Sequence, residues 1–440
     1  MKTYINPPSS EWNSLIERPN FPAENLDEKV RGIIAKVKTE GDAALRQFSK
    51  AFDKVELTEL KVTEAEIEFA VSQISDELKD AIAVAAKNIR TFHESQKSAE
   101  AEVETMPGIT CWRQSVAIEN VGLYIPGGTA PLFSTILMLA IPAQIAGCKR
   151  LVLCTPPDKN GNINPAILYT ASYLGISEIY KVGGAQAIAA LAFGTESIAN
   201  VNKIFGPGNQ FVTKAKELVQ QNGVAIDMPA GPSEVLIIAD ENADADFVAS
   251  DLLSQAEHGV DSQVVLVTND ADLIEKVEIA LQQQLQQLPR MEFAKKALEN
   301  SFSVVLDTMY DCIDFSNLYA PEHLIFAVKN SISYVGEIQN AGSVFLGNYS
   351  CESAGDYASG TNHTLPTNGY ARSYSGVSLD SFVKKITFQK ITKMGLQNIG
   401  KTIEVMAEAE QLFAHKNAVS IRLKKIQDEM SITEKSFQNR

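Results

Sequence analysis

The chain is poor in cysteine, histidine and tryptophan: its 440 residues include five cysteines, five histidines and two tryptophans. No two cysteines stand in CxxC spacing, which disfavours a redox pair or a structural zinc site built on thiolates. We therefore expect the cysteines to be reduced packing residues in a reducing compartment. His93, which lies apart from the other histidines, is expected to be structural as well.

Basic residues and long apolar runs are also scarce. The 39 Lys and Arg residues are outnumbered by 54 Asp and Glu residues, for a formal net charge of -15. Such a surface repels a phosphate backbone, so no nucleic-acid partner is expected. The most apolar stretch, residues 130–146, is shorter than the ~20 residues of a membrane span, and it contains Pro131, Pro142 and Gln144. We expect a buried helix there.

Two further features are missing. The N-terminal segment MKTYINPPSSEW has no apolar signal-peptide core, so we expect a cytoplasmic protein with no membrane partner. The dinucleotide fingerprint GxGxxG is also absent, because Gly206 and Gly208 supply its first two glycines but Phe211 occupies the third position. A nicotinamide cofactor would therefore bind without the standard phosphate loop.

What the sequence does contain is a clear alternation of periodicities. With 45% hydrophobic residues, the chain can form one large core or two adjoining ones. Helical spacing dominates from Leu26 to Ser98, with a break at Gly41, and we expect it again after Ser378, through SFVKKITFQKIT. Between them, short apolar strands alternate with helices from about Thr110, which predicts an α/β fold with parallel sheets covered on both faces. Ligands of such folds bind at the carboxyl ends of the strands.

Gln255 and His258 form the first candidate site, near the end of a predicted helix in SQAEHG. A spacing of three places both side chains on one helical face, where they could share a metal ion, while Glu257 points elsewhere. The alternative is a histidine stabilised by the helix C-terminus.

Glu322 and His323 form the second, in YAPEHLIF, where Pro321 restricts the backbone. An imidazole is the natural general base at neutral pH, and a carboxylate beside it can activate water or orient a partner. The alternative is an ordinary surface loop.

Three further positions are weaker. Asp356 and His363 lie in the small-residue loop ESAGDYASGTNHTLPT, which can shape an active site or make ordinary turns. For His363, a role behind a metal ligand and a role in holding the loop stay equally open. Glu410 and His415 end a long helix and could simply be solvated.

Several long segments together closely resemble the histidinol dehydrogenase family. They occur in the family's order over roughly residues 25 to 425 and are VGLYIPGGTAPLFST, VGGAQAIAALAFGTES, KIFGPGNQFV, AIDMPAGPSEVL, SQAEHG, YAPEHL, ESAGDYASGTNHTLPT and EAEQLFAHKNAVSIR. Matches of this number and length make chance resemblance improbable.

The resemblance implies a role for each matching position. One Zn²⁺ per subunit would be bound by Gln255, His258, Asp356 and His415. Substrate would contact Ser233, Glu322, His323, Glu410 and the four metal ligands, and NAD would contact Tyr124, Gln186 and Asn209. His323 would accept the proton and Glu322 would activate water. The family forms homodimers with shared active sites, in which Glu410 and His415 reach into the partner's site.

The implied activity is the NAD-dependent, four-electron oxidation of L-histidinol to L-histidine through L-histidinaldehyde, the last steps of histidine biosynthesis. Zinc would orient the substrate through its amine and imidazole, which are good zinc donors. The main alternative is a sister dehydrogenase for another small amino or sulfonated alcohol. A zinc hydrolase without nicotinamide and a non-catalytic dimeric scaffold are further alternatives.

The expected architecture follows from the resemblance and the periodicity together. It is an α/β fold with two Rossmann-like domains of mainly parallel sheets, a helical N-terminal region and a helical C-terminal extension. Residues 1–24 would form an arm, residues 25–128 with 234–378 a discontinuous domain carrying most metal and catalytic residues, residues 129–233 an incomplete Rossmann-like NAD-binding domain, and residues 379–440 the extension used in dimerisation.

Overall fold

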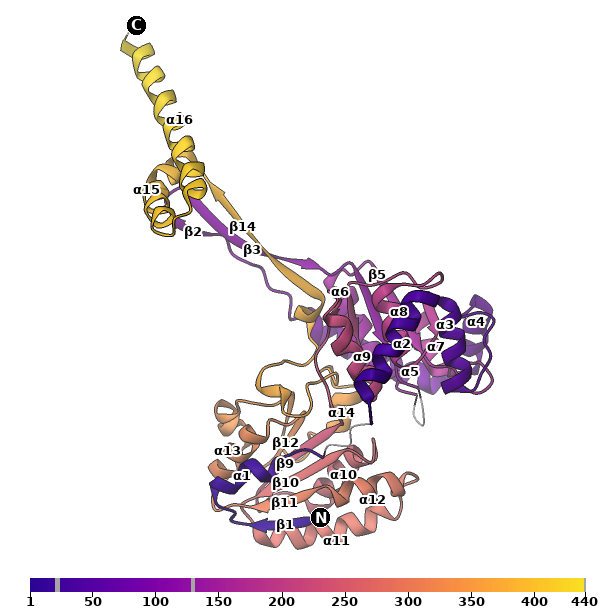
Figure 1. Cartoon of the computed structure of the whole chain (residues 1–440). Coiled ribbons are helices and arrows are strands. Elements are labelled where there is room, and N and C mark those ends of the chain that lie inside the picture. Colours follow the sequence, from indigo (N-terminus) through magenta and orange to yellow (C-terminus); the bar gives the residue numbers. More distant parts are fainter. Residues whose placement is uncertain (20–23, 128–130, 439–440) are drawn as a thin grey trace. The chain divides into compact units, whose positions relative to one another are not determined.

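The computed structural model describes residues 1–19, 24–127 and 131–438. For residues 433–438 it describes the backbone only. The chain divides into two compact units. The first consists of Met1–Gln96 with Ile118–Phe382, and the second of Lys97–Ala117 with Val383–Arg440. The first unit contains two parallel sheets and the second an antiparallel one (Figure 1).

One sheet of the first unit has six strands, and all neighbouring strands run parallel. In spatial order they are β1 (Lys2–Ile5), β11 (Phe302–Val305), β10 (Gln263–Thr268), β9 (Glu234–Ala239), β12 (His323–Ala327) and β13 (Ser343–Leu346). Successive residues of β9 enter different cores: Val235 and Ile237 one, Leu236 and Ile238 the other. Because both faces are buried, the central strands are continuous apolar runs.

Helices cover both faces of this sheet. One face packs against α10 (Ala245–Ala256), α11 (Ala271–Leu285) and α12 (Met291–Glu299), and the other against α1 (Trp12–Leu15) and α13 (Met309–Tyr319). A short helix, α14 (Glu352–Tyr357), contacts α10. The side chains of Asp244, Asp270 and Thr308 cap α10, α11 and α13 by accepting first-turn N–H groups, which explains where these helices begin.

The other sheet has five parallel strands. In spatial order they are β6 (Glu178–Lys181), β5 (Arg150–Thr155), β4 (Asn120–Tyr124), β7 (Lys203–Phe205) and β8 (Ala225–Ile226). α8 (Gly184–Phe193) and α9 (Gln210–Gln220) cover one face, and α6 (Ser134–Ala146) and α7 (Pro165–Tyr173) the other. α6 is the buried helix expected in the apolar stretch. None of the helices within the described ranges has the length and apolarity to cross a membrane.

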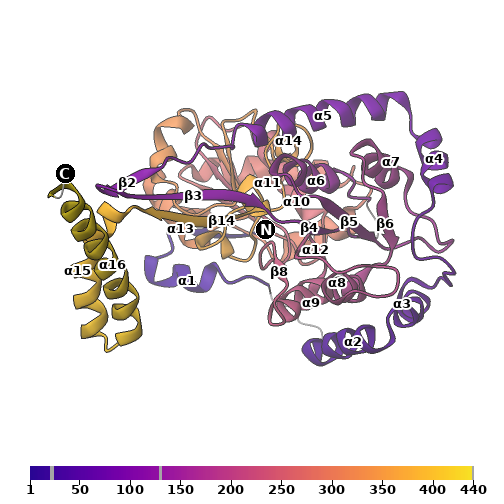
Figure 2. The same ribbon diagram turned by 90° about the horizontal axis from the view of Figure 1, so that it is seen from above.

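The N-terminal region is helical, as predicted. It forms α2 (Leu26–Glu40), α3 (Asp42–Phe48), α4 (Glu64–Gln73) and α5 (Asp76–Glu94). Gly41, with φ of 54°, ends α2, a backbone conformation that glycine adopts without strain. α2 packs against α8 and α9, and α5 against α6 (Figure 2).

This packing differs from the expected domain boundaries. Residues 26–94 and β4 join the five-stranded sheet, although we assigned residues 25–128 to the domain of residues 234–378. The expected boundary between residues 128 and 129 lies outside the described residues. β1, from the expected N-terminal arm, adds an edge strand to the six-stranded sheet. Local periodicity reports that a helix has an apolar face but not which sheet that face covers.

The second unit is a β-sheet followed by a helical hairpin. β2 (Val103–Met106), β3 (Ile109–Ala117) and β14 (Val383–Ile391) form the antiparallel sheet, and α15 (Lys393–Ala409) and α16 (Phe413–Gln438) the hairpin. The helix predicted through SFVKKITFQKIT is therefore wrong over 383–391, where the chain pairs with 109–117 along its whole length. Stacking of Phe388 on Trp112, with ring centroids 5.3 Å apart, stabilises this long-range pairing.

The remaining regular segments are short. 3-10 turns lie at Ser9–Glu11, Ser331–Glu337, Tyr370–Arg372 and Leu379–Phe382, and a π-helical turn at Ser49–Asp53. All five cysteines are free thiols, with Cys154 and Cys312 buried. His93 is also buried, and its Nδ1 lies 2.9 Å from the backbone oxygen of Ile89.

Candidate active site

Glu322 and His323 lie at the amino end of β12, and His323 is the first residue of that strand. Both side chains are buried, at 6% and 3% exposure, so they do not form a solvated loop pair. Ser233 directly precedes β9, and Gln255 lies in the last turn of α10. These residues meet at the amino ends of β9 and β12, whereas we expected the carboxyl ends. The reason is that α10 runs back along the sheet, which returns its last turn to the edge where β9 begins.

His323 is surrounded by acceptors. Its Nδ1 lies 3.3 Å from the backbone oxygen of Glu234 and 3.6 Å from Oε2 of Glu322, and its Nε2 lies 3.5 Å from Oδ1 of Asp356. Burial by itself would lower the pKa of His323, but the carboxylates of Glu322, Glu352 and Asp356 raise it well above its ordinary value. An Nδ1–H that donates to the Glu234 carbonyl leaves Nε2 as the atom that can exchange a proton.

Glu322 is held in place by the neighbouring strand. Its Oε2 accepts the backbone N–H of Glu234 at 2.9 Å, and the amide of Gln255 lies 3.3 Å from the same oxygen. A buried carboxylate with a backbone donor has a fixed orientation beside His323.

Three potential metal ligands converge next to this pair. One ligand atom from each of His258, Glu352 and Asp356 lies within 4.8 Å of the others. Glu352 and Asp356 are four residues apart on α14, so they share one helical face. His258 follows the C-terminus of α10 and is partly exposed to solvent. Burial of the rest of the ring lowers its pKa.

Several atoms in this cluster lack the partner that a cation would supply. Within the described part of the chain, Oε2 of Glu352 and Oδ1 of Asp356 are buried without a hydrogen-bond partner, and the contact of Oδ1 with Nε2 of His323 is a 3.5 Å ion pair only. The side-chain oxygen of Gln255 lies 2.6 Å from Oε1 of Glu352, so two acceptors face each other unless the amide is turned and its nitrogen donates to Glu352. Orphaned oxygens beside an imidazole nitrogen form a donor set that suits zinc or a similar divalent cation.

Burial and nearby charges shift the pKa values of the carboxyl groups in this cluster. Burial raises the pKa of Glu352 well above its usual value, and His323 only partly opposes this. Burial would also raise the pKa of Asp356, but His323 and the other nearby histidines hold it below its ordinary value. Asp251, which accepts the backbone N–H of Glu352, has a pKa raised to about 7 by burial.

The remaining predicted metal ligand belongs to the second unit. Glu410 follows the end of α15, His415 lies in the first turn of α16, and both are exposed. The first unit by itself therefore brings together three of the four expected ligands: Gln255, His258 and Asp356.

A cavity of about 250 Å³ adjoins this cluster. Its lining includes Ser233, His258, Glu322 and Asn209, and Oγ of Ser233 lies 3.4 Å from Nδ1 of His258. The cavity thus brings expected substrate-contacting residues to one space beside the candidate catalytic pair.

A second cavity, of about 760 Å³, contains all three residues expected to contact NAD: Tyr124, Gln186 and Asn209. Tyr124 is the last residue of β4, Gln186 lies in the first turn of α8 after β6, and Asn209 is the N-cap of α9 after β7. This is the carboxyl edge of the sheet, as expected for a doubly wound fold. The hydroxyl of Tyr124 accepts the backbone N–H of Gly184 at 3.1 Å, and burial raises the pKa of Tyr124 to about 12. Asn209 caps α9 through its side-chain oxygen and also lines the 250 Å³ cavity, so the two cavities meet at this residue.

Sequence reasoning missed Glu352 and did not decide the role of His363. The signal for Glu352 was its spacing of four from Asp356, which places both on one face only if the segment is helical. His363 lies behind the cluster: its Nδ1 is 2.8 Å from the backbone oxygen of Asp356, and its Nε2 is 3.0 Å from Oγ1 of Thr135 on α6. It therefore links the end of α14, which carries Asp356, to α6.

Fold and site together define an α/β protein with a candidate metal-centred active site beside a doubly wound sheet. The family described as histidinol dehydrogenase matches residues 16–423. Histidinol dehydrogenase of Bacteroides fragilis (strain YCH46) is 59% identical over 426 residues, which cover 97% of this chain and 100% of the relative. Histidinol dehydrogenase of Escherichia coli (strain K12) is 53% identical over 430 residues, covering 95% and 98%.

A solved structure agrees with these relatives. The crystal structure of histidinol dehydrogenase from Elizabethkingia anophelis superposes with a TM-score of 0.95 at 62% identity, covering 97% of this chain and 99% of that one. The chain belongs to the histidinol dehydrogenase family, a family of oxidoreductases.

Proposed function

We propose that this protein oxidises L-histidinol to L-histidine through L-histidinaldehyde, with NAD as the hydride acceptor in both steps. The observation that carries the proposal is the convergence of Gln255, His258 and Asp356 beside the buried pair Glu322–His323. The cavity containing Tyr124, Gln186 and Asn209 opens next to this cluster through the shared residue Asn209. The same arrangement would complete the last steps of histidine biosynthesis.

The metal site would be formed by Gln255, His258, Asp356 and the partner's His415. A bound divalent cation would fix the amine and imidazole of the substrate and offset the carboxylate charge that raises the pKa of His323. Glu352 would act as a positioning residue by accepting the amide N–H of Gln255, which lies within hydrogen-bonding distance when that amide is turned.

The chemistry of the chain's own residues follows from their geometry. His323, with Nδ1 turned to the Glu234 carbonyl, would take the substrate hydroxyl proton at Nε2. NAD supplies the hydride acceptor. Glu322, oriented by the backbone N–H of Glu234, would then activate the water that hydrates the aldehyde. Burial of both residues would keep the reactive aldehyde from bulk solvent.

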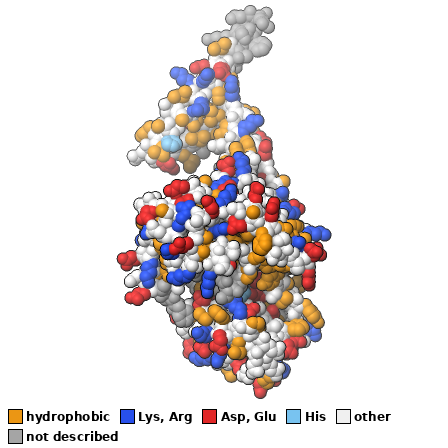
Figure 3. All heavy atoms as spheres, turned by 90° about the vertical axis from the view of Figure 1, so that its right-hand side faces the viewer, with side chains coloured by type: hydrophobic (Ala, Val, Ile, Leu, Met, Phe, Trp, Pro, Cys, Tyr) orange, Lys and Arg blue, Asp and Glu red, His pale blue; other side chains and the backbone are white. Residues whose placement is uncertain are grey.

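Glu410 and His415 support a homodimer with shared active sites. Both are exposed on the helical hairpin of the second unit. Figure 3 shows hydrophobic side chains gathered on this hairpin, and the exposed ones include Met394, Val405, Met406, Leu412, Phe413 and Ile421. An apolar surface of this kind marks a protein–protein contact, and dimerisation through it would bring Glu410 and His415 to the partner's site.

The test is a stoichiometric assay with purified protein, zinc and NAD. We expect two NADH formed per histidinol consumed, with L-histidine as the product. Turnover of another small amino or sulfonated alcohol at ten-fold or greater preference would instead identify a sister dehydrogenase. No NADH from a zinc-loaded sample would contradict the proposal.

A further inference from the structure

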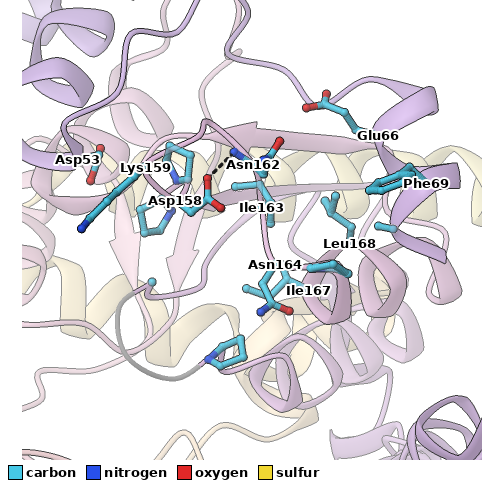
Figure 4. Close-up of a pocket in the computed structure, with 16 residues that line it drawn as sticks. Asp53, Glu66, Phe69, Asp158, Lys159, Asn162, Ile163, Asn164, Ile167 and Leu168 are labelled. Atoms are coloured by element: carbon cyan, nitrogen blue, oxygen red, sulfur yellow. Dashed lines mark hydrogen bonds between the residues drawn. The ribbon is translucent and has the colours of Figure 1, made fainter. Parts of the chain in front are cut away.

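The 760 Å³ cavity adjoins another cavity besides the 250 Å³ one that contains Glu322. A third cavity, of about 730 Å³, shares Asp53, Gly127, Pro156 and Pro157 with it (Figure 4). Asp53 ends the π-helical turn Ser49–Asp53, and it does not line the cavity that holds Glu322. Asp53 thus lies where the 760 Å³ cavity adjoins the third cavity, and Asn209 lies where it adjoins the 250 Å³ cavity.

Asp53 has a carboxylate that forms no ion pair among the described residues. Within the described residues, its Oδ2 is also buried without a hydrogen-bond partner. Burial raises the pKa of Asp53 to about 6. At pH 8 the side chain is ionised, so the wall of the cavity carries a negative charge that no ion pair among the described residues neutralises.

The orientation of a dinucleotide follows from the position of the catalytic pair. This step rests on the proposed function: hydride transfer requires the nicotinamide near Glu322 and His323, and therefore at the Asn209 side. The adenosine half then extends toward Asp53. A carboxylate at this position of a dinucleotide site accepts hydrogen bonds from ribose hydroxyls, and it repels a phosphate in their place.

We propose that Asp53 is a specificity-determining residue, which favours NAD over NADP by accepting hydrogen bonds from the adenosine ribose. Two cations that line the same cavities as Asp53 make the role of its charge testable. Lys29, exposed on α2, lines the same cavity as Asp53, and Lys159 lies at the same end of the third cavity (Figure 4). Without the carboxylate, these lysines would attract the additional phosphate of NADP.

The experiment measures equilibrium binding of NAD and NADP to the zinc-loaded protein at pH 8 by calorimetry. Asp53→Asn should weaken NAD binding by about ten-fold, since hydrogen bonds to a charged group are lost. NADP binding should stay equal or improve, so the preference for NAD falls by at least about ten-fold. Asp53→Glu, which keeps the charge, should retain a preference for NAD.

Asp158→Asn is the matched control. Asp158 lines the third cavity but not the 760 Å³ cavity. Its Oδ1 accepts the backbone N–H groups of Asn160 and Asn162, and the side-chain oxygen of an Asn can accept them as well. This variant should bind both dinucleotides as the unaltered protein does.

The outcomes separate the two proposals. If the unaltered protein binds NAD but Asp53→Asn changes NAD and NADP affinity equally or not at all, the role of Asp53 is overturned and the proposed function stands. If the unaltered protein binds neither dinucleotide, the proposed function fails, and the role of Asp53 with it.

Discussion

The backbone N–H of Glu234 donates to Oε2 of Glu322 at 2.9 Å, and the side chain of the same Glu234 forms a buried ion pair with Arg18. Nε and Nη2 of Arg18 lie 2.9 and 3.1 Å from the two carboxylate oxygens, and the guanidinium stacks 3.5 Å above the ring of Tyr319. The candidate catalytic carboxylate therefore depends on a strand position fixed by a residue near the N-terminus.

Arg18→Met should lower the free energy of unfolding by about 3–5 kcal/mol, because it leaves the buried Glu234 carboxylate without its partner. The measurement is urea denaturation at pH 7. Arg31→Met is the control, since Arg31 pairs with Asp27 on an exposed helical face, and it should cost less than about 1 kcal/mol. Similar losses in the two variants would contradict a special role for the Arg18–Glu234 pair.

His323→Asn should lower turnover of histidinol by at least about 100-fold, because the proton acceptor is lost. Asn is smaller than His, but its amide nitrogen can replace Nδ1 as the donor to the Glu234 carbonyl, so circular dichroism, zinc content and NAD affinity should be unchanged. Steady-state kinetics of histidinol oxidation, with these three properties as controls, tests the prediction. A rate equal to that of the unaltered protein would remove His323 as the base.

Glu352→Gln should weaken zinc binding by about 10- to 100-fold, as expected for a residue that orients a ligand. Competition against a chromophoric chelator measures the affinity without reference to activity. Glu257→Gln is the control, because Glu257 is adjacent to His258 but is not a member of the cluster of His258, Glu352 and Asp356. Unchanged zinc affinity in Glu352→Gln would exclude the positioning role.

Mixing inactive subunits tests the shared active site. A heterodimer of His323→Asn and His415→Ala subunits would contain one site with both residues intact, provided that His415 serves the partner. Equal mixing and reassembly should then restore about a quarter of the original activity, since half of the dimers are mixed and each has one intact site. Activity that stays at the level of the separate variants would show that each subunit uses its own His415.

Asp53→Asn should stabilise the protein at pH 8 and not at pH 3. The pKa of Asp53 in the folded state is about 6, above its ordinary value of 3.8, so the folded state binds the proton more tightly and stability falls as the pH rises from below 4 through 6. The full shift would amount to about 3 kcal/mol, and partial exposure of the side chain reduces the expected gain to about 1 kcal/mol. Thermal unfolding at the two pH values measures it, and an equal effect at both would contradict the shift.

The sequence predicted more of the candidate site than of its surroundings. Glu322–His323 and Gln255–His258 are close in the chain, so short spacing and helix geometry sufficed to pair them. The residues expected around NAD lie at three separate strand-to-helix connections, and the rule for parallel sheets predicts that such connections meet at one edge. Glu352 and Asp53 were not predicted, because what distinguishes them is a buried carboxylate oxygen without a hydrogen-bond partner, which no local sequence pattern indicates.

The errors have a common physical origin. The strand Val383–Ile391 has a mixed pattern that also suits a helix, and its pairing with Ile109–Ala117 decided the outcome. The helices of residues 26–94 were recognised, but their attachment to the five-stranded sheet was not. By itself the sequence determined the class of fold and the family, and it predicted candidate site residues, because these depend on residue types at fixed spacing. Only the tertiary structure decided which elements share a sheet and which polar atoms are left without partners, because both depend on contacts between segments distant in the chain.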